Sequence, residues 1–90
     1  MKLIGTVLWW DVRDQNGIIK DLEGRKFYVD VSVLESHMLS RMKSGAVVCF
    51  EQNPMVKDAL CAHRVSPANA REKTKLAKEF ENRRQLSFFE

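Results

Sequence analysis

The sequence predicts an all-β fold: a small antiparallel barrel of five strands, followed by a helical tail at the C-terminal end. Three observations predict this fold. Five short stretches are rich in β-branched and aromatic residues, and turn residues separate them. The segment between the third and fourth stretches, residues 34–42, has apolar residues at helical spacing and no two-residue alternation. Finally, 90 residues leave no material for a covering sheet, so the strands must close on themselves to remove their edges.

Each expected strand is bounded by residues that interrupt extended structure. Asp11 ends the first, the turn from Asp21 to Gly24 separates the second from the third, and Asn53-Pro54 ends the fourth. Residues 34–42 are expected to form a short helical turn or an ordered loop. The expected strands are residues 3–10, 17–20, 26–31, 46–52 and 59–65.

The composition limits the classes of function. A chain with 44% hydrophobic and 30% charged residues is typical of one small globular domain. Such a small domain is not expected to hold a deep catalytic cleft, and we expect no enzyme. The net charge of +3 permits a polyanionic partner without requiring one. We expect no signal peptide, no membrane partner and a cytoplasmic location, because no leader pattern and no long apolar run is present.

The histidines and cysteines do not form a recognisable chemical site. His37 and His63 have no third metal ligand or nucleophile–base partner at a suitable spacing, so we expect no catalytic residue, metal or cofactor. Cys49 and Cys61 are expected to be free thiols in a reducing compartment. An alternative stays open, in which the two thiols face each other across neighbouring strands.

Three stretches resemble, in order, the motifs of the cold-shock domain family. Residues 5–10, Gly-Thr-Val-Leu-Trp-Trp, resemble the family's G-x-V-K-W-F. Residues 42–51 resemble L-K-x-G-x-x-V-x-F-E, and residues 61–68 resemble Q-A-A-N-V-T-P-A. The resemblance extends over residues 3–68. It implies a five-stranded barrel of the OB type that stacks single-stranded nucleic acid on aromatic side chains.

The expected binding surface departs from the family pattern. The family's K-G-F-G-F-I corresponds to residues 14–19, in which Asn16 and Ile18 replace the two phenylalanines. The family's V-F-V-H-F-S corresponds to residues 27–32, in which Tyr28 keeps an aromatic ring but an aspartate replaces the stacking histidine. Each lost ring removes about 1–3 kcal/mol of stacking, and carboxylates repel phosphates, so binding is expected to be weak. The carboxylates near this surface are Asp11, Asp14 and Asp30.

The leading hypothesis is a non-enzymatic protein that binds single-stranded DNA or RNA weakly. An alternative treats Trp9 and Tyr28 as ordinary barrel and rim residues of a scaffold. In the leading hypothesis the stacking residues are Trp9, Trp10 and Tyr28, and the phosphate contacts are Lys20, Arg25, Lys26 and the cations of the tail.

The tail has a different composition from the barrel. Residues 68–84 are strong helix formers without Gly or Pro, and Ser66 and Pro67 suit a helix N-cap and the first helical position. We therefore divide the chain into a barrel (1–66), a basic helical tail (67–84) and a terminal peptide (85–90). The tail helix is suited to docking on the barrel, to contacting phosphates, or to remaining a solvated charged helix.

The terminal peptide has a resemblance of its own. Residues 85–89, Gln-Leu-Ser-Phe-Phe, resemble the pentapeptide Q-L-S/D-L-F that binds the bacterial sliding clamp, with Phe88 in place of the usual Leu. This resemblance implies that Leu86 and Phe89 fill apolar pockets of the clamp and that Gln85 makes polar contacts. The rival function is thus an adaptor in DNA replication or repair that uses the barrel as a scaffold. In the other interpretation, these apolar residues pack on the barrel or on a second protomer.

Overall fold

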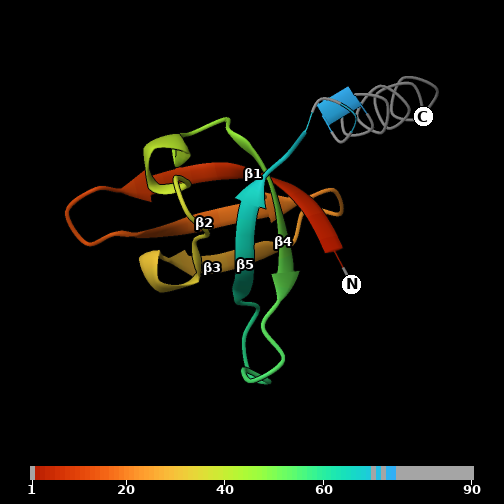
Figure 1. The fold of residues 1–90 in the computed structure, drawn as a ribbon. Helices are drawn as coiled ribbons and strands as arrows, with labels where there is room; N and C mark the ends of the chain where they lie inside the picture. The colour runs from red at the N-terminus through yellow and green to blue at the C-terminus, as the bar shows by residue number, and fades with distance from the viewer. Residues whose placement is uncertain (1, 70, 72, 75–90) are drawn as a thin grey trace.

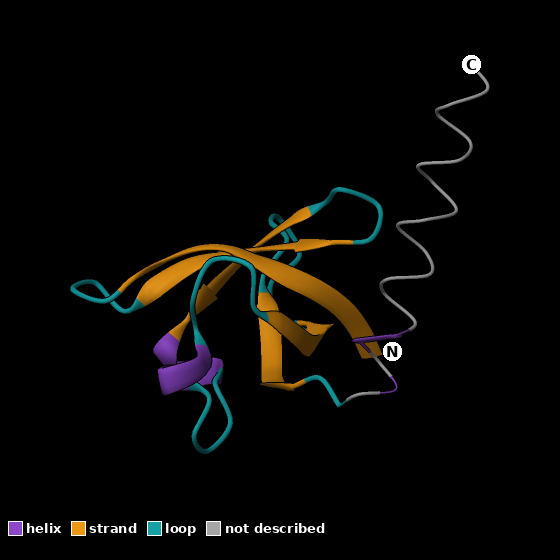
Figure 2. Cartoon of the chain, turned by 90° about the horizontal axis from the view of Figure 1, so that it is seen from above, coloured by secondary structure: helices purple, strands orange, loops and turns teal. Residues whose placement is uncertain are grey.

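The structure is a computed structural model that describes residues 2–69, 71, 73 and 74 (Figure 1). Its five strands form one antiparallel sheet in the order β3-β2-β1-β4-β5. The sheet curls into a half-barrel (Figure 2). The all-β, OB-type architecture predicted from the sequence is therefore confirmed. The strands are β1 (Lys2–Asp11), β2 (Asn16–Asp21), β3 (Lys26–Asp30), β4 (Val47–Gln52) and β5 (Ala62–Pro67).

The curl brings the two ends of the sheet together. The backbone N–H of Tyr28 in β3 donates to the carbonyl oxygen of Leu60 at 2.9 Å, and Tyr28 forms a parallel bridge with Cys61 just before β5. A second parallel bridge joins Leu34 to Val65 of β5. These contacts pair part of each edge strand and so shorten the edges that the half-barrel leaves open.

The concave side of the sheet holds the hydrophobic core. The rings of Phe27 and Phe50 meet edge to face at its centre, with 4.9 Å between their centroids. Two methionines from the segment between β3 and β4, Met38 and Met42, are buried in the same cluster. The other buried members are Val7, Ile19, Val29, Val48, Ala62 and Val65.

The connection between β3 and β4 contains two short 3-10 turns, η1 (Val31–Val33) and η2 (Leu39–Arg41). The expected helical turn or ordered loop in residues 34–42 is therefore confirmed at η2. The third strand ends one residue earlier than expected because Asp30 caps η1, where its side chain accepts a hydrogen bond from the backbone N–H of Ser32 at 2.9 Å.

The fifth strand lies further along the chain than predicted, and this corrects the expected start of the tail. Ser66 pairs with Cys49 and Pro67 pairs with Val48 in the β4–β5 ladder. Ser66 is therefore not a helix cap, and Pro67 is not a first helical residue. A proline is tolerated at this place because it ends a strand at the edge of the sheet, where a missing N–H costs little.

The two cysteines do not face each other. Cys49 is buried opposite Ser66, whereas the carbonyl oxygen of Cys61 accepts a hydrogen bond from the backbone N–H of Asn53 at 2.8 Å. Both thiols are free of disulfide bonds, as the sequence analysis expected. The two cysteines are apart because Cys61 lies beside Asn53, and Asn53 is four positions beyond Cys49 along the chain.

The tail lies mostly outside the described residues. Residues 71, 73 and 74 are helical, and residues 75–84 and the terminal peptide 85–90 are not described. The described part of the chain contains no helix that is both long and apolar enough to cross a membrane.

Candidate nucleic-acid interface

The convex side of β1, β2 and β3 presents a row of apolar side chains across three strands. Trp9 of β1 lies opposite Ile18 of β2, and Ile18 lies opposite Tyr28 of β3. Trp9 is 47% exposed and Tyr28 is 43% exposed. Phe27 and Val29, which flank Tyr28 along β3, are fully buried on the other side of the sheet. We call Trp9, Ile18 and Tyr28 the aromatic row. It offers two rings on which a planar ligand can stack.

A β-bulge in β1 places Trp9 on this side. Val7 lies opposite Ile19 and Trp9 lies opposite Ile18, so Leu8 is an extra residue in the ladder. The hydroxyl of Ser44 donates to the carbonyl oxygen of Leu8 at 2.9 Å and so supplies a partner that the interrupted ladder lacks.

The two tryptophans that the sequence analysis grouped together lie on opposite faces of β1, as consecutive strand residues do, and the bulge sets which of them points outward. Trp10 is half-buried and packs against the core, and its indole Nε1 is buried without a hydrogen-bond partner. Only Trp9 belongs to the aromatic row. The motif does not show which of the two rings faces outward, because that choice depends on the bulge.

A basic row lies beside the aromatic row and is two residues away from it along β2 and β3. Thr6 of β1 lies opposite Lys20 of β2, and Lys20 lies opposite Lys26 of β3. Both lysines are exposed, and within the described part of the chain neither forms an ion pair. We call these three residues the basic row. Its ammonium groups are exposed, and the expected contact of Lys20 and Lys26 with phosphates stays a prediction.

Arg25, the third expected phosphate contact, has a structural partner instead. Its Nε donates to Oδ2 of Asp21 at 2.7 Å, and its guanidinium lies 5.5 Å from the centroid of the Phe27 ring. Asp21 is buried and also accepts hydrogen bonds from the backbone N–H groups of Glu23 and Arg25, at 3.0 and 2.8 Å. The hydrogen bond to Asp21 raises the pKa of the Arg25 guanidinium above its ordinary value. Arg25 therefore holds the β2–β3 turn together.

An acidic row lies on the same face of the sheet, beside the aromatic row and on the side away from the basic row. Asp11 of β1 lies opposite Asn16 of β2, and Asn16 lies opposite Asp30 of β3. Oδ1 of Asp11 accepts hydrogen bonds from the backbone N–H groups of Arg13 and Asp14, at 2.8 and 3.1 Å. Oδ1 of Asp30 accepts from both the backbone N–H and the hydroxyl of Ser32. Besides carrying charges that repel phosphates, these two aspartates thus stabilise the turns that follow β1 and β3.

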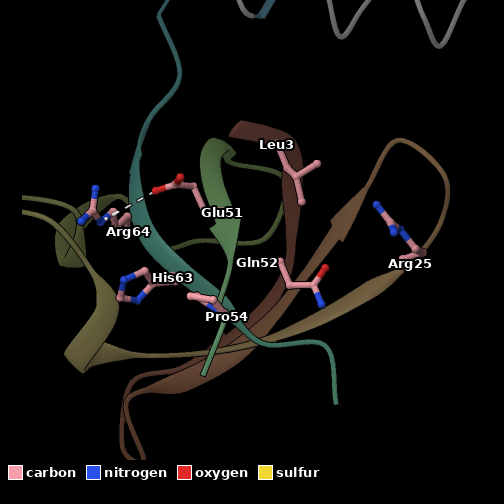
Figure 3. Close-up of a pocket in the computed structure, with 7 residues that line it drawn as sticks. All are labelled: Leu3, Arg25, Glu51, Gln52, Pro54, His63 and Arg64. Carbon is pink, nitrogen blue, oxygen red and sulfur yellow. Dashed lines mark ion pairs between the residues drawn. The ribbon is translucent and has the colours of Figure 1, made fainter. Parts of the chain in front are cut away.

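A separate open groove of about 520 Å³ lies between β1, the β4–β5 hairpin and the β2–β3 turn (Figure 3). Its cations are close to carboxylates: Nε of Arg64 lies 3.8 Å from Oε2 of Glu51, and Arg25 is bonded to Asp21. His63 also lines this groove, with its Nδ1 buried and unpartnered. Because its charges are balanced, the groove has less attraction for a polyanion than the basic row. Among the described residues there is no group of three or more His, Cys, Asp or Glu arranged to hold a metal ion.

Comparison of the chain with models of protein families gives no match, and comparison with curated proteins gives none either. We define the candidate interface by the structure alone, as the three rows on the convex side of the sheet. The expected partner-binding residues Gln85, Leu86, Phe88 and Phe89 lie outside the described residues.

Proposed function

We propose that this protein is a non-enzymatic, cold-shock-like binder of single-stranded DNA or RNA, and that it binds through the convex side of β1, β2 and β3. The observation that supports the proposal is the aromatic row, with Trp9 and Tyr28 exposed on the sheet and the basic row beside it. A single strand needs both features, because its bases stack on aromatic rings and its phosphates attract cations.

The same rows indicate weak binding. Two stacking rings contribute about 1–3 kcal/mol each, and the two lysines of the basic row add a salt-dependent attraction. The carboxylates of Asp11 and Asp30 oppose that attraction at the other side of the aromatic row. The expected dissociation constant is on the order of micromolar or weaker. A cytoplasmic setting belongs to the same proposal, because two unbridged thiols suit a reducing compartment. A bacterial setting belongs to it only through the resemblance of residues 85–89 to a bacterial clamp-binding peptide.

The proposal is tested by titrating the full chain with a labelled heptanucleotide of thymidine at about 50 and 200 mM salt. Trp9→Ala and Tyr28→Ala should each weaken binding by about fivefold or more, because each removes one stacking ring. Met55→Ala is the matched control, since Met55 is an apolar residue that is 87% exposed in the β4–β5 loop, away from the three rows.

The scaffold interpretation predicts a different result. If Trp9→Ala and Tyr28→Ala keep the circular dichroism spectrum and bind as tightly as the Met55→Ala control, the aromatic row is not a stacking surface and the proposed function is wrong. If the wild-type chain binds no single strand at low salt, the proposal fails without need of the variants.

A further inference from the structure

The three rows have an order that matches the parts of a nucleotide. Along β2 the sequence of outward residues is Asn16, Ile18 and Lys20, and along β3 it is Asp30, Tyr28 and Lys26. Neighbouring rows are two residues apart, which corresponds to about 6.6–6.8 Å along a strand. A base that stacks on Tyr28 while its phosphate lies at the basic row therefore extends its free edge toward the acidic row.

The acidic row offers hydrogen-bond acceptors to that edge. Oδ1 of Asp11 and Oδ1 of Asp30 are engaged by the turns that follow them, and no described residue donates to the Oδ2 atom of either carboxylate. An ionised carboxylate can accept hydrogen bonds but cannot donate them. A base edge with amino or ring N–H groups is therefore favoured here, and an edge dominated by carbonyl oxygens is repelled.

Guanine is the base that best fits these acceptors. Its Watson–Crick edge presents a ring N–H and an exocyclic amino group side by side, and both can donate to a carboxylate in charge-assisted hydrogen bonds. Thymine and uracil present one ring N–H between two carbonyl oxygens. We infer that the acidic row makes this face selective for guanine over thymine or uracil in a single strand. This inference rests on the proposed function and adds a base preference to it.

The test compares three heptanucleotides that differ only in the central base of a thymidine strand: guanine, hypoxanthine or thymine. Hypoxanthine keeps the ring N–H of guanine but lacks its amino group. We expect the guanine strand to bind about fivefold more tightly or better than the thymine strand, since a carboxylate–base contact discriminates by about 1–3 kcal/mol. The hypoxanthine strand should bind with intermediate affinity.

Asp11→Asn and Asp30→Asn identify the residue that reads the base. Asparagine keeps the Oδ1 acceptor that caps each turn, but it replaces the second oxygen, Oδ2, with an amide donor. We expect at least one variant to lose the guanine preference while its melting temperature stays within a few degrees of wild type. Asp58→Asn is the matched control, because it removes one exposed carboxylate from the β4–β5 loop without touching the row.

The outcomes separate this inference from the function on which it rests. If guanine and thymine strands bind equally well and Trp9→Ala still weakens both, the base preference is wrong and the stacking surface stands. If the preference exists but neither aspartate variant changes it more than Asp58→Asn does, the acidic row is not its source and the inference is also wrong. If no strand binds, both the inference and the proposed function fail.

Discussion

Gly17 and Trp10 lie opposite each other in the β1–β2 ladder, and the contact leaves no space for a side chain on the glycine. A Cβ at Gly17 would lie 2.3 Å from the carbonyl oxygen of Trp9 and 3.1 Å from Cα of Trp10. The glycine thus allows Trp10 to pack against the core and keeps β1 in the register that turns Trp9 outward. Its role is to position the aromatic row rather than to contact nucleic acid.

Gly17→Ala should therefore disturb both tryptophans. We expect a loss of about 1–3 kcal/mol in the free energy of unfolding, as for other overpacked sites, together with a shift of the tryptophan emission in the folded state. Gly45→Ala is the comparison variant: an added Cβ there meets no atom within 4 Å, so any cost comes from the backbone φ of 91°, a conformation that Gly17 does not share. If Gly17→Ala has the stability and emission of wild type, the close contact is not a constraint on the fold.

The two kinds of cation near the β2–β3 turn should respond differently to substitution. Arg25→Ala should lower the melting temperature, because it leaves the buried Asp21 carboxylate without its guanidinium partner. Lys26→Ala should leave the melting temperature unchanged and reduce the salt dependence of single-strand binding by about one phosphate contact. Equal losses of affinity in the two variants, with no difference in stability, would contradict this division of roles.

The Arg25 contribution to stability should not depend on pH in the ordinary range. Pairing with Asp21 raises the pKa of Arg25 on folding, so its contribution is fully present below the pKa of an unfolded arginine. It is lost only as the pH rises through the still higher folded value. The difference in melting temperature between wild type and Arg25→Ala should therefore be constant between about pH 7 and 9, where arginine stays charged.

Ile18 is the one aliphatic member of the aromatic row, between Trp9 and Tyr28. Ile18→Phe should strengthen single-strand binding by about fivefold or more, because it adds a third ring to a continuous stacking surface. A folded Ile18→Phe variant without any gain in affinity would mean that the row is not presented to nucleic acid.

Asp30→His, which restores another aromatic of the family pattern, should instead be destabilising, since Asp30 caps η1.

The first four strands were predictable from the sequence because their signals are local, whereas β5 begins three residues later than predicted. The alternation in residues 26–30 and the turn residues around Asn53-Pro54 locate β3 and β4 within one residue. The bulge at Leu8 was not predictable, because it is defined by the pairing of β1 with β2 and leaves no mark in β1 alone. For the same reason the sequence did not show which of Trp9 and Trp10 faces outward.

The charged residues of the site were harder to interpret than the aromatic ones. Arg25 and Asp30 lie where an exposed, functional role is the simplest interpretation, yet their side chains bond to nearby turns. The signal that identifies such roles is the turn context: a carboxylate two residues before a backbone N–H forms an Asx turn. The lysines of the basic row lie outside any such turn and are exposed, and their expected contact with phosphates stays a prediction.

Deleting residues 85–90 tests the rival function. If these residues form a clamp-binding peptide, the deletion should abolish capture of a bacterial sliding clamp and leave the melting temperature and single-strand affinity nearly unchanged. Leu86→Ala in the full chain should reproduce the loss of capture, because this side chain is expected to fill a clamp pocket. If Phe88 and Phe89 instead cover the barrel, the deletion should cost about 2–4 kcal/mol of stability. A stable truncation that captures the clamp as well as the full chain does would contradict the adaptor hypothesis.

The most direct test of the account is a map of the amide chemical shifts of the isotopically labelled full chain during titration with a single-stranded heptanucleotide. We predict that the shifts change at the three rows on β1, β2 and β3, with the largest changes around Trp9, Ile18 and Tyr28. The groove residues Leu3, His63 and Arg64 should stay unaffected and serve as the internal control. Changes centred on the groove, or no changes at saturating oligonucleotide, would contradict the proposal that this sheet face binds single strands.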